Sequence, residues 1–183
     1  MSDSIDGEGE PLAQRAARLA SFERAVGAER GAPVIRLLPR DPALNPEVAL
    51  NAMLTGEENP LRDAVHPDWD ANPPWPPYTV DDLEAIDPAT ARQVLWLLLR
   101  HDMAYSSTRI SIERADELTA GLLSVAGPET RWWTNGAVQV AVPYPNTGQS
   151  SGGWTPLTRA TFDGGIIGVD TDAILILWLM DED

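Results

Sequence analysis

The chain has 183 residues, which is the size of one domain and enough to bury a core without covalent cross-links. It contains no cysteine, and all thirteen basic residues are arginine, which excludes disulfides, thiolate metal sites, Schiff-base lysines and the lysine of a phosphate-binding P-loop. The formal net charge of −15 disfavours direct contact with nucleic acid or anionic lipid and favours a basic protein partner.

The chain shows no signal for secretion or membrane insertion. Its beginning, Met1-Ser2-Asp3, lacks the basic and apolar regions of a secretion signal. The longest apolar runs, 94–99 and 173–180, fall short of the roughly 18 residues needed to cross a bilayer. We therefore expect a cytoplasmic protein that does not enter a membrane.

An acidic segment opens the chain. Residues 1–10 are rich in Asp, Glu and Gly, which predicts a flexible tail because they offer almost no apolar surface to bury. The remaining residues, 11–183, are expected to form a single domain.

Apolar residues at helical spacing follow the tail. Leu12, Leu19 and Val26 predict one face of an amphipathic helix that ends near Gly27. Arg15 is assigned to the polar residues on the other faces of this helix.

A short strand and a second helix come next. The run Val34–Leu38 predicts the strand. Asn45 and Pro46 then provide an N-cap and a first-turn proline for a helix through Leu54, closed by Gly56.

The segment 59–78 is dense in proline, which excludes both a helix and a central strand. It predicts a stiff, irregular loop that also contains Trp69 and Trp75. These tryptophans either clamp the loop onto the domain or form an exposed binding surface.

Helix signals resume after this loop. Thr79 and Asp82 have the spacing of a capping box, and Asp87 followed by Pro88 provides a further helix start. The run 94–99 is apolar on all sides, so this helix is expected to be a central core element.

A last helix is predicted from the N-cap Ser111 to the stop at Gly127-Pro128. Its apolar residues share one face: Ala115, Leu118, Leu122 and Val125.

Beyond Pro128 the apolar pattern changes to a period of two residues, typical of strands. The Asn-Gly dipeptide at 135–136 predicts a hairpin between 131–134 and 137–142, with Trp133 opposite Val138. Residues 143–153 are then expected to be a polar connector.

Three more strands are predicted at 157–163, 166–169 and 173–180, with 170–172 as the last turn. The strand 173–180 is apolar at every position, which suits an interior strand covered on both faces.

Together these elements predict an α+β fold. Residues 11–127 are expected to be mainly helical, and residues 128–183 are expected to form an antiparallel sheet on which the helices pack.

Few residues can support catalysis. The only histidines are His66, beside acidic residues in the proline-rich loop, and His101, at a helix end where capping is the expected role. No dinucleotide, phosphate-loop, zinc-protease or nucleophile-elbow motif occurs. We expect no cofactor and no metal.

Three aspartates, Asp163, Asp170 and Asp172, could meet at one end of the last strand pair and hold a cation. The spacing of a calcium-binding loop is missing, however, so the preferred interpretation is that they form turns.

The segment 154–183 contains Trp154, a strand pair with Trp178 and the acidic end Asp181-Glu182-Asp183. In this plan it resembles small acidic immunity proteins of bacterial toxin systems, which bind and neutralise a toxin domain. The resemblance covers about the last thirty residues.

Three hypotheses follow from the sequence. The first is a non-catalytic acidic module that binds a basic protein, with a toxin domain as the partner that the resemblance implies. The second is a small enzyme or metal or small-molecule binder with an Asp/His cleft, and the third is an inhibitor that mimics nucleic acid. The candidate binding residues are Trp69, Trp75, Trp154, Asp163, Asp170, Asp172, Asp181, Glu182 and Asp183.

Overall fold

The computed structural model describes residues 10–31, 33–61, 78–136, 157–158, 160 and 162–181. Their elements in chain order are α1 (Leu12–Arg30), β1 (Val34–Pro39), α2 (Pro46–Thr55), the 3-10 helix η1 (Val80–Asp82), β2 (Glu84–Ile86), α3 (Pro88–Arg100), α4 (Ile112–Leu123), β3 (Arg131–Thr134), β4 (Phe162–Val169) and β5 (Ala173–Asp181). The α+β class is confirmed. No helix in these ranges is long and apolar enough to span a membrane.

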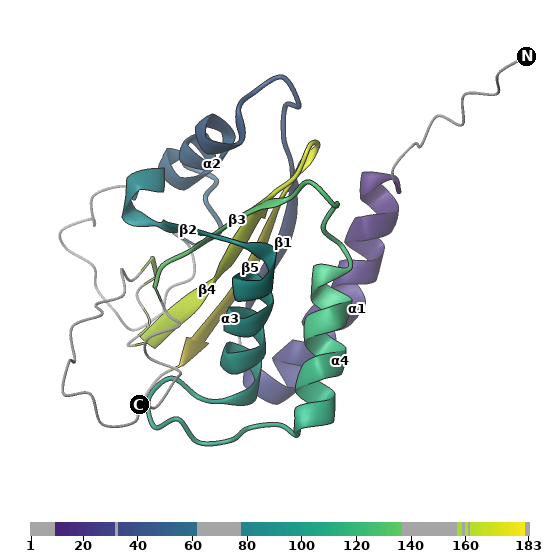
Figure 1. Ribbon diagram of the computed structural model, residues 1–183, viewed down its shortest axis with the longest axis vertical. Coiled ribbons are helices and arrows are strands. Elements are labelled where there is room, and N and C mark those ends of the chain that lie inside the picture. The colour runs from purple at the N-terminus through teal and green to yellow at the C-terminus, as the bar shows by residue number, and fades with distance from the viewer. Residues whose placement is uncertain are drawn as a thin grey trace, which may run out of the picture.

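The strands form one antiparallel sheet in the order β1-β5-β4-β3-β2 (Figure 1). The interior position of β5 confirms the expectation drawn from its apolar sequence. At its middle, Leu177 lies between Ile35 of β1 and Ile166 of β4. The N-terminal half of the chain also contributes to the sheet, because β1 and β2 form its two edges.

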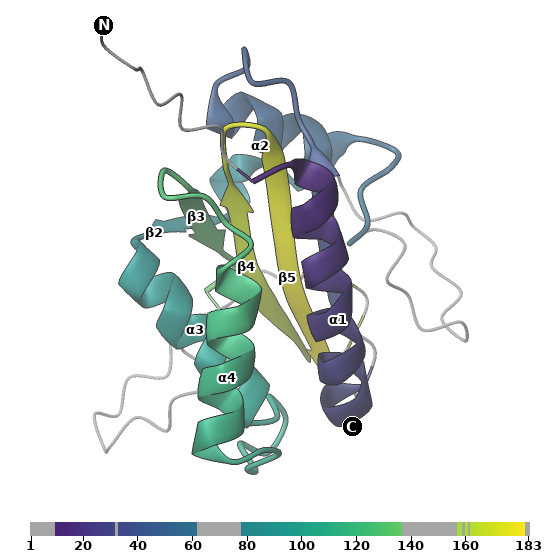
Figure 2. The same ribbon diagram turned by 90° about the vertical axis from the view of Figure 1, so that its right-hand side faces the viewer.

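Helices cover both faces of the sheet and enclose two cores. Alternate residues of β5 enter each core: Leu175 and Leu177 face α1, α3 and α4, whereas Ile176 and Trp178 face α2 and η1. Figure 2 shows α1 and α4 in front of the sheet and α2 behind its upper part. Because both faces of the sheet are covered, a strand in this position is stable when consecutive residues are apolar.

Side-chain caps begin three helices as the sequence predicts. Asn45 accepts a hydrogen bond from the Glu47 amide at 2.9 Å, and Asp87 accepts one from the Thr90 amide at 2.8 Å. Ser111 likewise caps α4. The first-turn amides of a helix lack partners within the helix, so these side chains fix where each helix starts.

Two predictions about α1 require correction. The helix continues past Gly27 to Arg30, and Arg15 lies on the buried side rather than on a polar face. Arg15 can be buried because its guanidinium meets the Val125 carbonyl and two aspartates.

The predicted pairing of Trp133 with Val138 is wrong. The Cα partners of Trp133 on its two sides are Ala85 of β2 and Ile167 of β4. Long-range pairing with the apolar strand β4 has taken precedence over the local turn signal. Residues 137–153 lie outside the described part of the chain.

The strand predicted at 157–163 is also wrong, because Leu157 and Thr158 are not in a strand. Instead β4 runs without a break through Gly164 and Gly165. A Cβ on Gly165 would lie 2.3 Å from the Leu177 carbonyl oxygen, so glycine here permits close contact within the sheet instead of marking a turn.

Candidate functional site

The predicted acidic residues at the β4–β5 turn are engaged inside the protein. Asp170 accepts from Arg15 at 2.8 Å and from the Gly127 amide at 2.8 Å. Asp172 contacts the same guanidinium at 2.7 Å. The Asp170 amide also closes the turn by donating to the Ala173 carbonyl, so Asp170 and Asp172 lie in a turn as expected, whereas Asp163 lies within β4 and is not a turn former.

A second arginine ties α1 to the far end of β5. Arg30 contacts Asp181 at 3.0 Å, and its side chain is 1% exposed. Asp181 also accepts from the Met103 amide at 2.7 Å. Arg15 and Arg30 therefore fasten the two ends of α1 to the two ends of β5.

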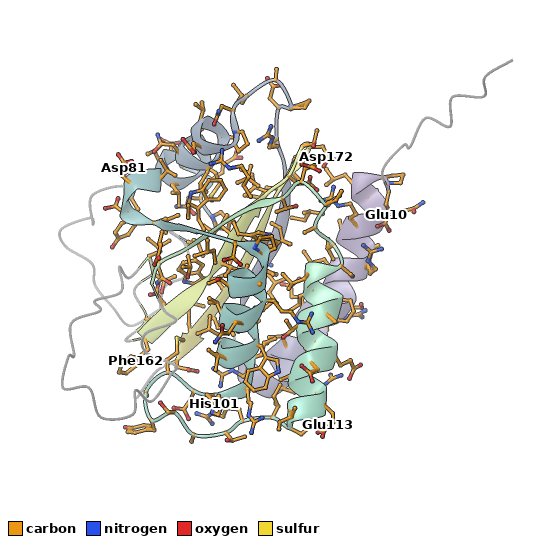
Figure 3. The ribbon with its side chains drawn as sticks, in the orientation of Figure 1. Glu10, Asp81, His101, Glu113, Phe162 and Asp172 are labelled. Carbon is orange, nitrogen blue, oxygen red and sulfur yellow. The ribbon has the colours of Figure 1, made fainter. Side chains whose placement is uncertain are left out.

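Asp163 lies apart from the other aspartates. Eight residues of β4 span the distance between the Asp163 end and the turn, which is roughly 25 Å at the usual rise per residue. Figure 3 shows Phe162, the neighbour of Asp163, and Asp172 at opposite ends of the sheet. The three aspartates therefore do not meet, and no group of three His, Asp or Glu among the described residues could hold a metal ion.

Asp163 is a buried acceptor that joins four segments. It accepts from the Leu157 amide at 2.8 Å, the Thr158 amide at 2.6 Å and the Trp178 indole at 3.2 Å. The amide of Asn135 approaches it at 3.4 Å. This carboxylate holds the end of β3, the segment before β4 and β5 together.

Burial raises the pKa of Asp163 above its usual range, although the N–H donors around it favour the charged form. Tyr78 lies near enough that burial and the negative charges of Asp163 and Asp82 raise the pKa of its phenol. A buried group with a raised pKa is a candidate for acid–base chemistry. No described histidine contacts Asp163; the Thr158 hydroxyl bonds to it but also accepts from the Ala160 amide, so the geometry supports a structural role.

The second histidine of the chain, His101, is the C-cap residue of α3, but its imidazole does not bond to the last-turn carbonyls as expected from the sequence. Its amide donates to the Leu97 carbonyl at 2.9 Å, and its ring packs edge-on against Trp96 with 6.5 Å between ring centres. The other predicted residues lie outside the described part of the chain: His66, Trp69, Trp75, Trp154, Glu182 and Asp183.

Among the described residues, two segments outside the predicted candidates carry a group of exposed carboxylates. Segments 41–61 and 78–87 carry four carboxylates each and no basic residue. Helix α2 and η1 contact one another, and the Val80 amide donates to Asn51 at 3.3 Å, which brings the two segments together. We call these two segments the acidic face; its carboxylates are Asp41, Glu47, Glu57, Glu58, Asp81, Asp82, Glu84 and Asp87.

The three helices on the other side of the sheet have a different charge balance. Together α1, α3 and α4 carry seven arginines and five carboxylates. Several of these arginines are paired within the same layer, for example Arg114 with Glu29 and Glu117. The surplus of negative charge is therefore concentrated around α2, η1 and β2.

Four of the eight carboxylates of the acidic face have no partner among the described residues. Glu57, Glu58, Asp81 and Glu84 are exposed and form no ion pair with a described arginine, whereas Glu47 contacts Arg131 at 2.7 Å. Figure 3 shows Asp81 beside α2, on the side of the molecule away from α1.

Comparison with known proteins does not add to this picture: no protein-family model, no curated protein and no solved structure matches the chain.

Proposed function

We propose that this protein is a non-catalytic binding module whose acidic face engages a basic surface of a partner protein. The observation that carries the proposal is the segregation of charge, with eight carboxylates and no basic residue in two adjoining segments. The opposite helical layer has a surplus of arginine, so the charge is not simply spread over the surface for solubility.

The physical effect of such a face is electrostatic steering. Unpaired carboxylates on one side create a negative potential that raises the rate of encounter with a basic surface, especially at low ionic strength. Rim charges of this kind affect the association rate more than the dissociation rate. An Arg-rich or Lys-rich protein is therefore the partner class that fits.

The resemblance of 154–183 to immunity proteins makes a bacterial toxin domain the first partner to test. An acidic protein that bound such a toxin domain would cover the basic surface of the toxin, for example a surface that contacts nucleic acid. This part of the proposal rests on the resemblance and on the charge of the acidic face together.

The test begins with zero-length cross-linking of carboxylates to amines in a host lysate, followed by purification of the cross-linked protein. Binding kinetics are then measured for Glu57→Gln/Asp81→Asn and for the matched control Asp116→Asn/Glu129→Gln. Both variants remove two exposed charges, but only the first removes them from the acidic face.

We expect the association rate at low salt to fall about tenfold for the acidic-face variant and to change little for the control. An equal effect of both variants, or an effect of neither, would contradict the proposal.

A further inference from the structure

The sheet has two edge strands, and β1 (Val34–Pro39) is the longer of them. Among the described residues, no strand pairs with β1 on the side away from β5. Apart from Arg36, every residue of β1 is apolar. Such an edge is a template for pairing with another chain, so an unprotected β1 would be a site of self-association.

The backbone of β1 directs its odd-numbered residues toward the free edge. The Arg40 amide donates to the Asp172 carbonyl at 3.0 Å, which continues the β1–β5 pairing by one residue. Successive residues of an antiparallel strand direct their N–H and C=O groups alternately to the two sides of the strand. The even-numbered residues of β1 therefore face β5, and Ile35 and Leu37 face outward.

Prolines limit the hydrogen-bond donors on this free edge. Pro33, directly before the strand, and Pro39, its last residue, both hold outward-facing positions. Proline has no N–H to donate, which is why it is tolerated at sheet edges. The outward donors of this stretch are therefore the amides of Ile35 and Leu37.

The Arg36 side chain crosses the free edge of β1. Side chains alternate between the two faces of a sheet, and Val34 and Leu38, which share the face of Arg36, belong to the core beneath α2. The Arg36 guanidinium nevertheless contacts Glu23 of α1, on the opposite face, at 2.5 Å. Because β5 occupies the inner side of β1, the side chain reaches α1 around the outer side of the strand.

On this path the guanidinium also occupies an outward backbone group. Nη1 of Arg36 donates to the Ile35 carbonyl at 2.7 Å, so this carbonyl is not open to a further strand. The Arg36 side chain is 48% exposed, and an ion pair that is this exposed contributes little to the stability of a fold. The main effect of this arrangement is therefore to cover the edge.

We propose that Arg36 keeps β1 from pairing with a second copy of this chain, an inference that goes beyond the proposed function and does not depend on it. The free edge is complementary to itself. In an antiparallel pair with a twofold axis at position 36, Ile35 of each copy lies opposite Leu37 of the other. This pairing uses both outward donors of each copy and requires the Ile35 carbonyl that Arg36 occupies.

The same pairing would also place like charges together. The two copies of Arg36 would lie directly opposite each other on one face of the joined sheet, where their positive charges repel. Arg36 therefore opposes the pairing in two ways, by occupying the carbonyl and by its charge. Replacing it with an apolar residue should remove both obstacles.

The first test measures the mass of Arg36→Val in solution by sedimentation equilibrium, with circular dichroism to show that the variant is folded. Arg131→Val is the matched control: the Arg131 side chain is also 48% exposed and paired with one glutamate, but it lies on the interior strand β3. At high protein concentration we expect the mass of Arg36→Val to be about twofold that of the wild type, and the mass of the control to be unchanged.

The second test makes use of the absence of cysteine from the chain. In the proposed pair, the two copies of position 36 form a non-hydrogen-bonded pair with Cα atoms about 4.5 Å apart, which is within the range of a disulfide. Under mild oxidation, Arg36→Cys should therefore form a cross-linked dimer much faster than Arg131→Cys.

A third variant shows whether the association uses the β1 edge. Leu37→Pro removes one of the two outward donors without removing a bond to β5. Combined with Arg36→Val, it should return the mass to that of the wild type.

Three results would overturn the inference: a mass of Arg36→Val equal to that of the wild type, equal rates of cross-linking at positions 36 and 131, or a dimer of Arg36→Val that Leu37→Pro does not dissociate. The third result would place the self-association on a different surface.

Discussion

Two buried aspartates show how the same residue type responds to different surroundings. Asp163 has N–H donors but no described arginine beside it, and burial raises its pKa. For Asp102 burial also raises the pKa, but hydrogen bonds from Ser107 and Tyr105 and the charges of Arg109 and Arg30 outweigh it and hold the pKa below the usual value. Neither residue is exposed for binding.

Replacing Asp163 should test its role as a structural acceptor. In Asp163→Asn one carboxylate oxygen becomes an NH2 group, which would face either the N–H donors that bond to Oδ2 or the side-chain amide of Asn135, so we expect a loss of about 2 kcal/mol in the free energy of unfolding. Urea denaturation measures it, with exposed Asp116→Asn as the control. An unchanged denaturation midpoint would show that the cluster does not stabilise the fold.

The two aspartates should also give opposite pH dependences. The lowered pKa of Asp102 means that its contribution to stability is present above the unfolded value of 3.8 and is lost as the pH falls through the folded value. The raised pKa of Asp163 means that the folded state binds this proton more tightly than the unfolded state does. The contribution of Asp163 to stability therefore decreases as the pH rises from 3.8 through the folded pKa.

Urea denaturation across this acidic range therefore distinguishes the two residues. The penalty of Asp102→Asn should shrink as the pH is lowered, whereas that of Asp163→Asn should grow. The same trend for both variants would contradict the assigned directions.

At the scale of the elements, the main finding is that α1 is held by a buried arginine at each end. The residues Arg15, Leu19, Phe22, Val26 and Arg30 follow one another at helical spacing on a single stripe. That spacing was available in the sequence, but an arginine on an apolar stripe is normally assigned to the solvent. The positions of Asp170 and Asp181, which the sheet determines, explain why Arg15 and Arg30 are buried.

Removing either arginine should be costly, because a buried carboxylate would lose its partner. We expect Arg15→Gln and Arg30→Gln each to lower the free energy of unfolding by about 3 kcal/mol. Arg24→Gln is the control, because Arg24 is exposed on the same helix and bonds only to the Ala20 carbonyl. Equal losses of stability for all three variants in thermal or urea unfolding would show that Arg15 and Arg30 do not hold α1 in place.

Local signals predicted elements well and strand partners poorly. The caps at Asn45, Asp87 and Ser111 locate helix starts, because each satisfies amides within three residues. Strand β2 was missed because its three residues carry no alternating pattern. The pairing of β3 with β2 and β4 depends on long-range packing that a turn dipeptide does not encode.

For the whole molecule, the important feature is the concentration of carboxylates in two adjoining segments around α2 and η1. The sequence gives the net charge, and it places carboxylates in both 41–61 and 78–87. It does not indicate that α2 and η1 touch, which turns two acidic stretches into one surface. The acidic candidates that the structure describes in the C-terminal region make contacts within the protein instead: Asp163, Asp170, Asp172 and Asp181.

Mutual repulsion within the acidic face gives a prediction that needs no partner. At low ionic strength, Glu57→Gln/Asp81→Asn should raise the melting temperature by about 2 °C, because like charges are removed from a crowded surface. The gain should fade in about 0.5 M NaCl, where screening is nearly complete. Asp116→Asn/Glu129→Gln should show a smaller gain, and an equal gain at all salt concentrations would argue against repulsion.

The two cores are built on the same strands. Trp132 and Trp133 are adjacent in the chain, yet the first belongs to the core under α1, α3 and α4 and the second to the core under α2. Unfolding of one helical layer would therefore expose strands that also carry the other core. We expect the molecule to melt in a single cooperative transition. A fragment that contains the helices of only one layer should therefore not fold on its own.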